Sequence, residues 1–387
     1  MSESPIKLSG IAWDHSRAFP PLVATAQRYE ETHPGVRIEW RKRTLDEFGH
    51  KPIDELAGEF DLIVIDHPWA GFAFNRGLIH DLEPLIDAAV TEDLAANSIG
   101  LSYESYVSED RLMAVPIDAA TPAASWRPDL LERLGAEPPK TWGGLIELAE
   151  RGVVAMPGFS ADVLLNFAMF AHALGGGPFT RGDRLADRNT GRACLDQLRR
   201  LGSRMPAEAF DFNPIQLAEA MTTGDANTYC PFAYTYRNYC RGDFTNKPLR
   251  YGELVTLDDG VELRSIIGGT GLAVSTSCRD PEAAAAYAGF VAAGSVQKGL
   301  YLHAGGQPAH VAAWNDPEAD RFAGGFFTGC RRAQERALLR PRYDGYVPLQ
   351  KSAGEVIRRC VRDGGDPDAA LDEVDRLYRD SLTPAGG

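Results

Sequence analysis

The sequence predicts an α/β protein of two domains, and two observations support this prediction. A chain of 387 residues is too long for one ordinary hydrophobic core. Within its first 80 residues, runs with the period of a strand alternate with runs with the period of a helix, in the order β-α-β-α-β-α. This order is typical of a mostly parallel sheet whose strands are joined by crossover helices.

Three strands are expected in this first segment. Residues 8–13 form the first, and residues 36–40 alternate apolar and polar side chains as the second. Residues 60–65 form the third, an almost unbroken apolar run of the kind that is buried on both faces of a sheet. Pro68 ends this strand, because proline has no N–H to donate to a neighbouring strand.

Helices are expected between and after these strands. An apolar helical stripe begins at Pro20 and Pro21 and stops before Pro34, and a second helix is expected over 45–57. Thr141 is expected to cap a helix that begins at Trp142. The remaining predicted strands are 111–116, 229–239 (with a loop) and 265–275, and the remaining helices are 126–135, 163–174, 190–201, 214–222, 281–291 and 366–378.

Composition and charge exclude several classes of partner. The chain is 44% hydrophobic and 24% charged, which is typical of a globular protein. Its formal net charge of −14 excludes broad contact with nucleic acid or an anionic membrane, because such contact requires basic surfaces. No apolar run approaches the ~18 residues of a membrane span. The first residues lack the features of a secretory signal. We therefore expect a cytoplasmic protein if Met1 is the native start, and a periplasmic or cell-surface one if a signal was removed.

Cofactor and metal motifs are absent from the sequence. The six cysteines are scattered without a C-x-x-C pair, which is neither a zinc spacing nor a disulfide framework. Cys230 and Cys240 are close enough in sequence to bridge, although free buried thiols are the expectation. No P-loop, H-E-x-x-H or G-x-S-x-G motif occurs. We expect no cofactor and no metal.

Polar and aromatic side chains follow the third strand directly. Asp66, His67 and Trp69 stand where the apolar run ends. In an open α/β sheet, ligands bind beyond the carboxyl ends of strands. These three side chains therefore have the chemistry of a binding-cleft wall. The alternative is that Asp66 only caps the next helix.

Four segments, in this order along the chain, resemble one family. They are similar to the extracellular solute-binding proteins of ABC importers, in the large family (family 1) that binds sugars and oligosaccharides, over about residues 8–380. The segments are Tyr-Glu-Glu-Thr-His-Pro-Gly-Val-Arg-Ile-Glu at 29–39; 60–66 with 77–82; 111–116 with 127–135 and 138–142; and 268–275 with 296–297 and Gly-Gly-Gln-Pro at 305–308.

The resemblance implies a two-lobed, periplasmic-binding-protein-like fold (type II) with a hinged cleft. The first lobe would hold residues 1–116 and 266–310, and the second 117–265 and 311–387. Ligand binding in the cleft would favour the closed form. The resemblance also implies a small-molecule ligand, a carbohydrate in most of the family, and an ABC permease as partner if the protein is exported. We expect a monomer and no nucleic-acid partner.

Loops after strands would carry the ligand contacts in such a cleft. Carboxylates accept hydrogen bonds from sugar hydroxyls, and indole faces stack on sugar rings. The candidate residues are Trp13, Asp14, His15, Asp66, His67, Trp69 and Asp118 from strand ends, Gly269 and Thr270 from the return segment, and Phe159, Tyr229, Tyr234 and Tyr236 from the second lobe. Several have a structural alternative: the tryptophans and tyrosines as core, the histidines as structural groups and Asp118 as a turn cap.

Two functions are compatible with these residues. The first is non-catalytic capture of a small polar ligand, a sugar or polyol, for ABC-type import. The alternative is a cytoplasmic enzyme or ligand sensor on the same fold. In that case the pairs Asp14–His15 and Asp66–His67, with Asp118, would perform acid–base or metal chemistry. The first function implies a binding protein rather than an enzyme.

Overall fold

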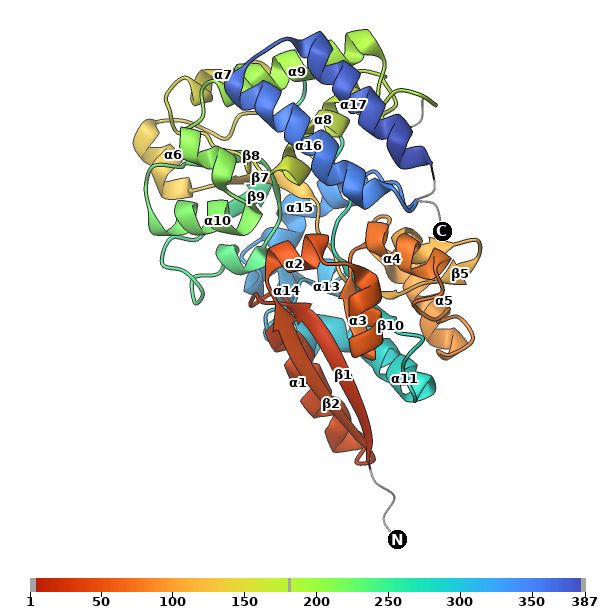
Figure 1. The fold of residues 1–387 in the computed structure, drawn as a ribbon. Coiled ribbons are helices and arrows are strands. Elements are labelled where there is room, and N and C mark those ends of the chain that lie inside the picture. Colours follow the sequence, from red (N-terminus) through yellow and green to blue (C-terminus); the bar gives the residue numbers. More distant parts are fainter. Residues whose placement is uncertain (1–4, 180–181, 384–387) are drawn as a thin grey trace. The chain divides into compact units, whose positions relative to one another are not determined.

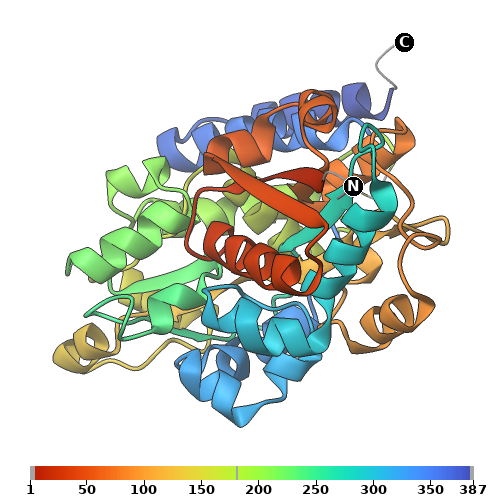
Figure 2. The ribbon, with the colours of Figure 1, turned by 90° about the horizontal axis from the view of Figure 1, so that it is seen from below.

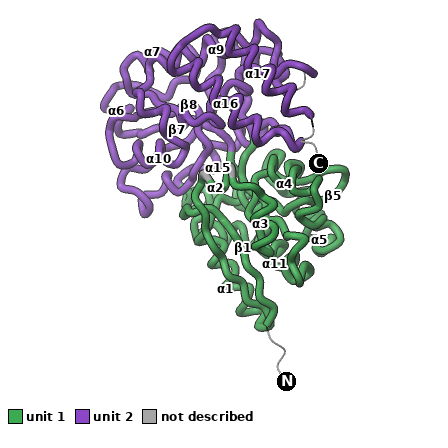
Figure 3. Tube along the Cα trace, in the orientation of Figure 1, with its two compact units in different colours: residues 1–120, 267–323 green, residues 121–266, 324–387 purple. Residues whose placement is uncertain are grey.

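The structure, a computed structural model, describes residues 5–179 and 182–383. It divides into two compact units, each built from two separate stretches of the chain (Figure 3). Unit 1 comprises Met1–Ala120 and Ile267–Ala323, and unit 2 comprises Thr121–Ile266 and Gly324–Gly387. Both units contain helices and strands, which confirms the predicted α/β class (Figure 1). That two lobes move about hinges stays a prediction.

Unit 1 is built around one five-stranded sheet. Its strands, in spatial order, are β2 (Val36–Arg43), β1 (Ile6–Trp13), β3 (Leu62–Ile65), β10 (Thr270–Val274) and β6 (Val115–Asp118). β1 is parallel to β2 and β3, as the β-α-β order predicts. β10 arrives from the second stretch of the chain and runs antiparallel to both β3 and β6. β1, β3 and β6 therefore point the same way, and their carboxyl ends lie at one edge of the sheet.

Helices cover this sheet, and the third strand, β3, is its central strand. All four residues of β3 are at most 1% exposed, which confirms the prediction of a strand buried on both faces. α1 packs along β2 (Figures 1 and 2). The helices of unit 1 are α1 (Phe19–Thr32), α2 (Leu45–His50), α3 (Ile53–Glu59), α4 (His67–Asn75), α5 (Ala88–Asn97), η1 (Glu104–Tyr106), α11 (Pro281–Ala292), α12 (Gly294–Val296), η4 (Gln297–Tyr301), α13 (Val311–Trp314) and α14 (Pro317–Phe322).

The single helix predicted over 45–57 is wrong, because the chain breaks it into α2 and α3. Pro52 is the cause: proline disfavours helical geometry at the residue before it, and Lys51 is extended (φ −68°, ψ 132°). α2 begins with a capping box, in which the Thr44 side chain and the Glu47 side chain each bond the other residue's backbone N–H.

Two predicted strands have different bounds in the structure. The segment 111–116 is divided between β5 (Arg111–Leu112), which pairs with β4 (Val107–Ser108), and β6. Asp118 is consequently the last residue of β6 rather than a residue beyond it. The strand predicted over 265–275 is shorter, since only β10 pairs in the sheet.

Unit 2 contains a three-stranded sheet that is antiparallel throughout. β7 (Pro122–Trp126) lies between β8 (Tyr229–Tyr234) and β9 (Arg250–Gly252), and both neighbours run against it. The expectation of mostly parallel sheets is therefore wrong for this unit. Three residues separate β7 from β6, at the point where the chain leaves unit 1, and no β-α-β crossover joins β7 to a parallel neighbour within unit 2.

Helices make up most of unit 2. α8, α9, α16 and α17 pack on one another (Figure 1). Thr141 caps α7 by accepting the Gly144 N–H at 3.2 Å, as predicted, and Gly135 ends α6 with φ 60°. The helices are α6 (Pro128–Leu134), α7 (Trp142–Ala149), α8 (Ser160–Ala173), α9 (Arg188–Gly202), η2 (Ala207–Asp211), α10 (Pro214–Thr223), η3 (Arg237–Cys240), α15 (Phe326–Glu335), α16 (Tyr346–Asp363) and α17 (Pro367–Leu382).

Candidate functional site

One edge of the unit 1 sheet gathers most of the predicted ligand residues. Trp13 is the last residue of β1, Asp66 follows β3, and Asp118 ends β6. Thr270 begins β10 and is the direct partner of Asp118 across these two strands. Gly269, just before it, has φ +89°, and a Cβ there would lie 2.2 Å from the carbonyl oxygen of Asp118. Only glycine fits this approach.

Asp118 forms a buried, two-pronged ion pair with Arg17. The Arg17 Nε donates to Asp118 Oδ2 at 2.8 Å, and Nη2 donates to the other carboxylate oxygen. Arg17 is 3% exposed and Asp118 is 2% exposed. The pair ties the loop after β1 to the end of β6. Asp118 is thus an anchor for a basic side chain rather than a simple turn cap, the structural alternative considered for it.

Arg17 was missed by sequence reasoning. The signal that could have found it is a basic residue in the loop directly after the first strand, at the same sheet edge as the Asp-rich strand ends. A guanidinium matches a carboxylate with two parallel hydrogen bonds, so an arginine at that edge is a natural partner for Asp118.

Trp13 is buried within the unit rather than open to solvent. It is 3% exposed and belongs to the hydrophobic core of unit 1. The ring centroids of Trp13 and Phe48 lie 5.1 Å apart, and the Arg17 guanidinium carbon lies 5.8 Å from the Trp13 ring centroid. The Trp13 indole Nε1 and the Thr270 Oγ1 are buried without a hydrogen-bond partner among the described residues. Buried polar atoms are nearly always bonded, so each of these two atoms calls for a partner such as a buried water.

Asp14 and His15 have opposite environments. The Asp14 side chain is 56% exposed and lies 3.0 Å from the Lys42 Nζ. The His15 Nδ1 accepts the backbone N–H of Arg17 at 2.9 Å. Burial, and secondly the Arg17 charge, lower the pKa of His15 to about 3, against the opposing effect of Asp14. His15 is therefore neutral near pH 7 and acts as a hydrogen-bond acceptor.

The residues after β3 begin the next helix. Asp66 caps α4 by accepting the His67 N–H at 2.9 Å, so the capping alternative is present, while its side chain keeps 21% exposure. The His67 side chain is fully buried and meets the Tyr106 ring edge-on. Trp69 is half-buried, and its Nε1 donates to the Gly49 carbonyl at 3.0 Å.

The predicted tyrosines of unit 2 are spread along β8. Tyr229 begins the strand, is 1% exposed and lies nearly parallel to Trp126, with ring centroids 6.4 Å apart. Burial raises the pKa of Tyr229. Tyr234 ends the strand and is half-buried. Since a strand rises about 3.3 Å per residue, β8 separates these two rings and does not bring them to one place.

Tyr236 and Phe159 stand at the ends of other elements of unit 2. Tyr236 is 5% exposed, and the Tyr251 hydroxyl lies 3.3 Å from both its backbone N–H and its carbonyl oxygen. Phe159 is half-buried at the N-cap position of α8. A Cβ on the neighbouring Gly158 would lie 2.3 Å from Phe210 Cα, which explains the glycine in this turn.

Two charged residues of unit 2 were also missed by sequence reasoning. Asp162 lies in the first turn of α8, where burial raises its pKa to about 7 against the opposing effects of its own backbone hydrogen bond and, secondly, the charge of Arg340. The Arg340 guanidinium lies 6.0 Å from the centroid of the Tyr234 ring. The only sequence signal was the position of Asp162 just after the Pro-Gly-Phe-Ser turn.

The alternative hypothesis, acid–base or metal chemistry by an Asp/His cluster, receives no support from this geometry. Over residues 5–179 and 182–383, no group of three His, Cys, Asp or Glu side chains is placed to hold a metal ion. A neutral His15 is a poor proton donor near pH 7. All six cysteines are buried and unbridged.

No helix within the described ranges is both long and apolar enough to cross a membrane.

The family comparison agrees with this architecture. The sequence profile of the bacterial extracellular solute-binding proteins matches residues 24–319. The chain belongs to this family. The predicted resemblance, and the solute-binding function that goes with it, are confirmed. A sequence search of the curated proteins finds no match.

Solved structures with the same fold are distant in sequence. Maltose-bound MalE3 of T. maritima is 16% identical, with a TM-score of 0.83 over 97% of this chain and 99% of that one. An ABC transporter solute-binding protein of Agrobacterium radiobacter K84 in complex with ribitol is 18% identical, with a TM-score of 0.82 over 97% and 99%. One of Thermotoga lettingae TMO bound with α-D-tagatose is 16% identical, with a TM-score of 0.82 over 98% and 100%. These similarities confirm the predicted two-lobed solute-binding fold.

Proposed function

We propose that this protein captures a sugar or polyol and delivers it to an ABC importer. Membership in the solute-binding family supports the binding role, and the similar structures that hold maltose, ribitol and tagatose support the ligand class. The observation that carries the proposal is the meeting of the carboxyl ends of β1, β3 and β6 at one edge of the unit 1 sheet. Ligands of open α/β sheets bind at such edges.

The side chains at this edge have the chemistry that a hydroxyl-rich ligand needs. Asp14 and Asp66 keep exposed carboxylate surface, and carboxylates accept strong hydrogen bonds from hydroxyl groups. Trp13 and Thr270 stand at the same sheet edge, and their Nε1 and Oγ1 atoms are buried without a partner among the described residues. In this proposal the Arg17–Asp118 pair holds the edge in a fixed geometry, so that less conformational freedom is lost when the ligand binds.

The remaining candidates have supporting or unassigned roles in the proposal. His15, His67 and Trp69 hold neighbouring loops through the bonds and packing described above. Gly269 lets the chain pass close to Asp118. That Phe159, Tyr229, Tyr234 and Tyr236 touch the same ligand, and that lobes of residues 1–116 with 266–310 and 117–265 with 311–387 close on it, stay predictions.

The proposed role requires the protein to meet its ligand outside the cytoplasmic membrane, as the family description implies. We propose a periplasmic or cell-surface location, a monomeric state and an ABC permease as partner. Fractionation of cells that express the native gene with a C-terminal tag tests the location. Recovery of the tagged protein only in the cytoplasmic fraction would contradict import.

Isothermal titration against maltose, ribitol, tagatose and a wider sugar and polyol panel tests the ligand class. We expect at least one micromolar ligand, which corresponds to about −8 kcal/mol. Absence of binding by every member at millimolar concentration would contradict the proposal.

Asp66→Asn is the variant that tests the site. Asparagine caps helices as well as aspartate does, so α4 is retained while the charge is lost. We expect the best ligand to bind about tenfold more weakly, because hydrogen bonds to charged groups contribute more than neutral ones. Asp187→Asn is the matched control, since the Asp187 side chain also caps a helix, α9 of unit 2, and the substitution should leave binding unchanged.

A further inference from the structure

Unit 2 contains a groove of its own, apart from the sheet edge of unit 1. It has a volume of about 560 Å³, which is within the range of small-molecule sites. One side is α10, with Glu219 and Thr223, and the other includes Tyr239 and Phe244. All of the lining residues belong to unit 2.

Three aromatic rings line this groove. Phe244 is 42% exposed, which is unusual in a chain whose other large apolar side chains are mostly buried. Its ring meets that of Tyr239 edge-on, with centroids 5.3 Å apart. Phe212 lines the groove from the residue after η2 and is half-buried. The faces of aromatic rings carry negative electrostatic potential and attract cations.

One carboxylate, that of Glu219, stands among these rings. Glu219 is exposed, and its closest polar side-chain contact is the Tyr239 hydroxyl, which donates to its Oε1 at 3.5 Å. No ion pair of Glu219 occurs among the described residues. Burial, and secondly the Glu219 charge, raise the pKa of Tyr239, so this hydroxyl stays neutral. The groove therefore carries one negative charge without a basic partner.

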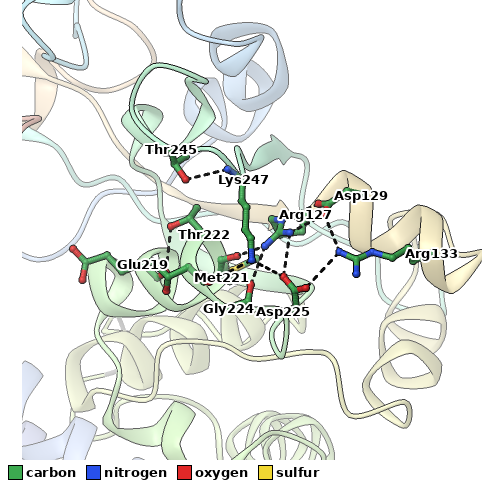
Figure 4. Close-up of polar contacts among 11 residues, drawn as sticks. Arg127, Asp129, Arg133, Glu219, Met221, Thr222, Gly224, Asp225, Thr245 and Lys247 are labelled. Atoms are coloured by element: carbon green, nitrogen blue, oxygen red, sulfur yellow. Dashed lines mark hydrogen bonds and ion pairs between the residues drawn. The ribbon is translucent and has the colours of Figure 1, made fainter.

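The basic side chains close to the groove are held by other groups. Arg127 donates two hydrogen bonds to Asp129 and one each to the carbonyls of Met221 and Gly224. Lys247 pairs with Asp225 at 2.8 Å. Figure 4 shows the Glu219 side chain pointing away from both of these cations.

We propose that this groove is a second binding site, for a small quaternary ammonium compound. Aromatic faces and a single carboxylate attract a positive charge, and the hydroxyls of Thr222 and Thr223 already donate to carbonyls of α10. A quaternary ammonium has no N–H to satisfy and loses little hydration when it enters an aromatic site. The site is independent of the proposed sugar site, because it uses none of the same residues and lies in unit 2.

Titration of the full chain with choline chloride tests this proposal. NMR or isothermal titration is carried out at constant ionic strength, with 3,3-dimethylbutanol as the uncharged analogue of choline. We expect choline to bind about tenfold more tightly than the analogue, since cation–π and charge attraction are both lost in the neutral compound. Two outcomes would overturn the proposal. One is equal affinity for the two compounds, and the other is no detectable binding of choline at a concentration of about 20 mM.

Two variants locate the binding within the groove. Glu219→Gln and Phe244→Ala change exposed side chains, so the fold should be retained, and each should weaken choline binding by about fivefold or more. Glu208→Gln is the matched control, because it removes an exposed carboxylate of the same unit outside the groove. A Glu219→Gln protein that binds choline as tightly as the parent would overturn the assignment.

The sugar panel keeps the two proposals separate. The Glu219→Gln and Phe244→Ala proteins should bind the best sugar or polyol with the affinity of the parent. Loss of choline binding with sugar binding intact supports the second site. Choline binding that is displaced by the sugar would overturn it, because the two sites share no residue.

Discussion

His15 is held neutral in the folded protein, and this makes stability depend on pH. Its folded-state pKa is lowered from 6.5 to about 3, so the unfolded chain binds a proton that the folded chain does not. As far as His15 is concerned, the free energy of unfolding is therefore highest above pH 6.5 and decreases as the pH falls from 6.5 toward 3. The loss is at most about 1.4 kcal/mol per pH unit from this group.

A comparison with His15→Asn checks this prediction. Asparagine still offers an oxygen to the Arg17 N–H but does not titrate. Urea unfolding between pH 7 and pH 4.5 should show a shallower loss of stability for the variant than for the parent. Parallel pH profiles would contradict a His15 that is neutral in the folded protein.

The Arg17–Asp118 pair predicts an asymmetric response to mutation. Asp118→Asn leaves a buried guanidinium without its counter-charge, and we expect a loss of about 3–5 kcal/mol in unfolding free energy. The double variant Arg17→Met/Asp118→Leu removes both charges and should recover most of that loss. Urea unfolding of both variants measures this. A double variant that is as unstable as Asp118→Asn would show that the unpaired Arg17 charge does not cause the loss of stability.

At the residue scale, the sequence predicted where the candidate site residues lie in the fold, but not which side chains they contact. The positions of Asp14, Asp66 and Asp118 follow from where apolar runs end, because parallel strands end at the same sheet edge. That Asp118 faces Arg17 depends on a contact 101 positions apart in sequence, which no local pattern encodes. The burial of Trp13 likewise depends on Phe48, which is brought over it by α2.

Close helix packing in unit 2 depends on glycine at one position of α16. A Cβ on Gly354 would lie 2.2 Å from the carbonyl oxygen of Ser160, the first residue of α8. Gly354→Ala should therefore force the two helices apart and cost about 1–3 kcal/mol. Gly58→Ala in α3 is the control, since its Cβ meets nothing within 4 Å, and it should be neutral or stabilising by up to about 1 kcal/mol. Thermal unfolding of both variants tests the difference in sign.

At the element scale, periodicity located most helices and strands, and local chemistry set their ends. Thr141 and Gly135 were sufficient to place one helix start and one helix end. The break between α2 and α3 was missed because the apolar period continues across Pro52, which restricts the residue before it. The antiparallel sheet of unit 2 was missed because strand direction depends on which strands become neighbours, and that is a long-range property.

At the scale of the whole molecule, the order of four weak segments predicted the fold better than any single motif did. The family profile spans residues 24–319, across most of both units, and the solved structures cover at least 97% of this chain. Sequence identities of 16–18% leave the side chains of the ligand site largely free to differ. The fold was therefore predictable, whereas the ligand is not encoded in the segments that carry the resemblance.

Unit 2 should fold only when both of its stretches of chain are present. α16 and α17 come from the second stretch and pack on α8 and α9 from the first, and α15 packs on β9. A Cβ on Gly329 of α15 would lie 2.3 Å from the Tyr251 carbonyl, which shows how closely these elements approach. Residues 121–266 alone would expose the apolar faces of α8 and α9.

We therefore expect residues 121–266 to remain unfolded, and the same segment joined through a short Gly/Ser linker to residues 324–383 to fold cooperatively. The end of the first stretch contacts the second stretch, because Leu338 donates its N–H to the Ser265 carbonyl at 2.8 Å, and the linker has to span the length of α15 back to residue 324. Circular dichroism and denaturant titration of the two fragments measure the difference. A cooperative transition for 121–266 alone would show that the helices of the second stretch are not required for the core of this unit.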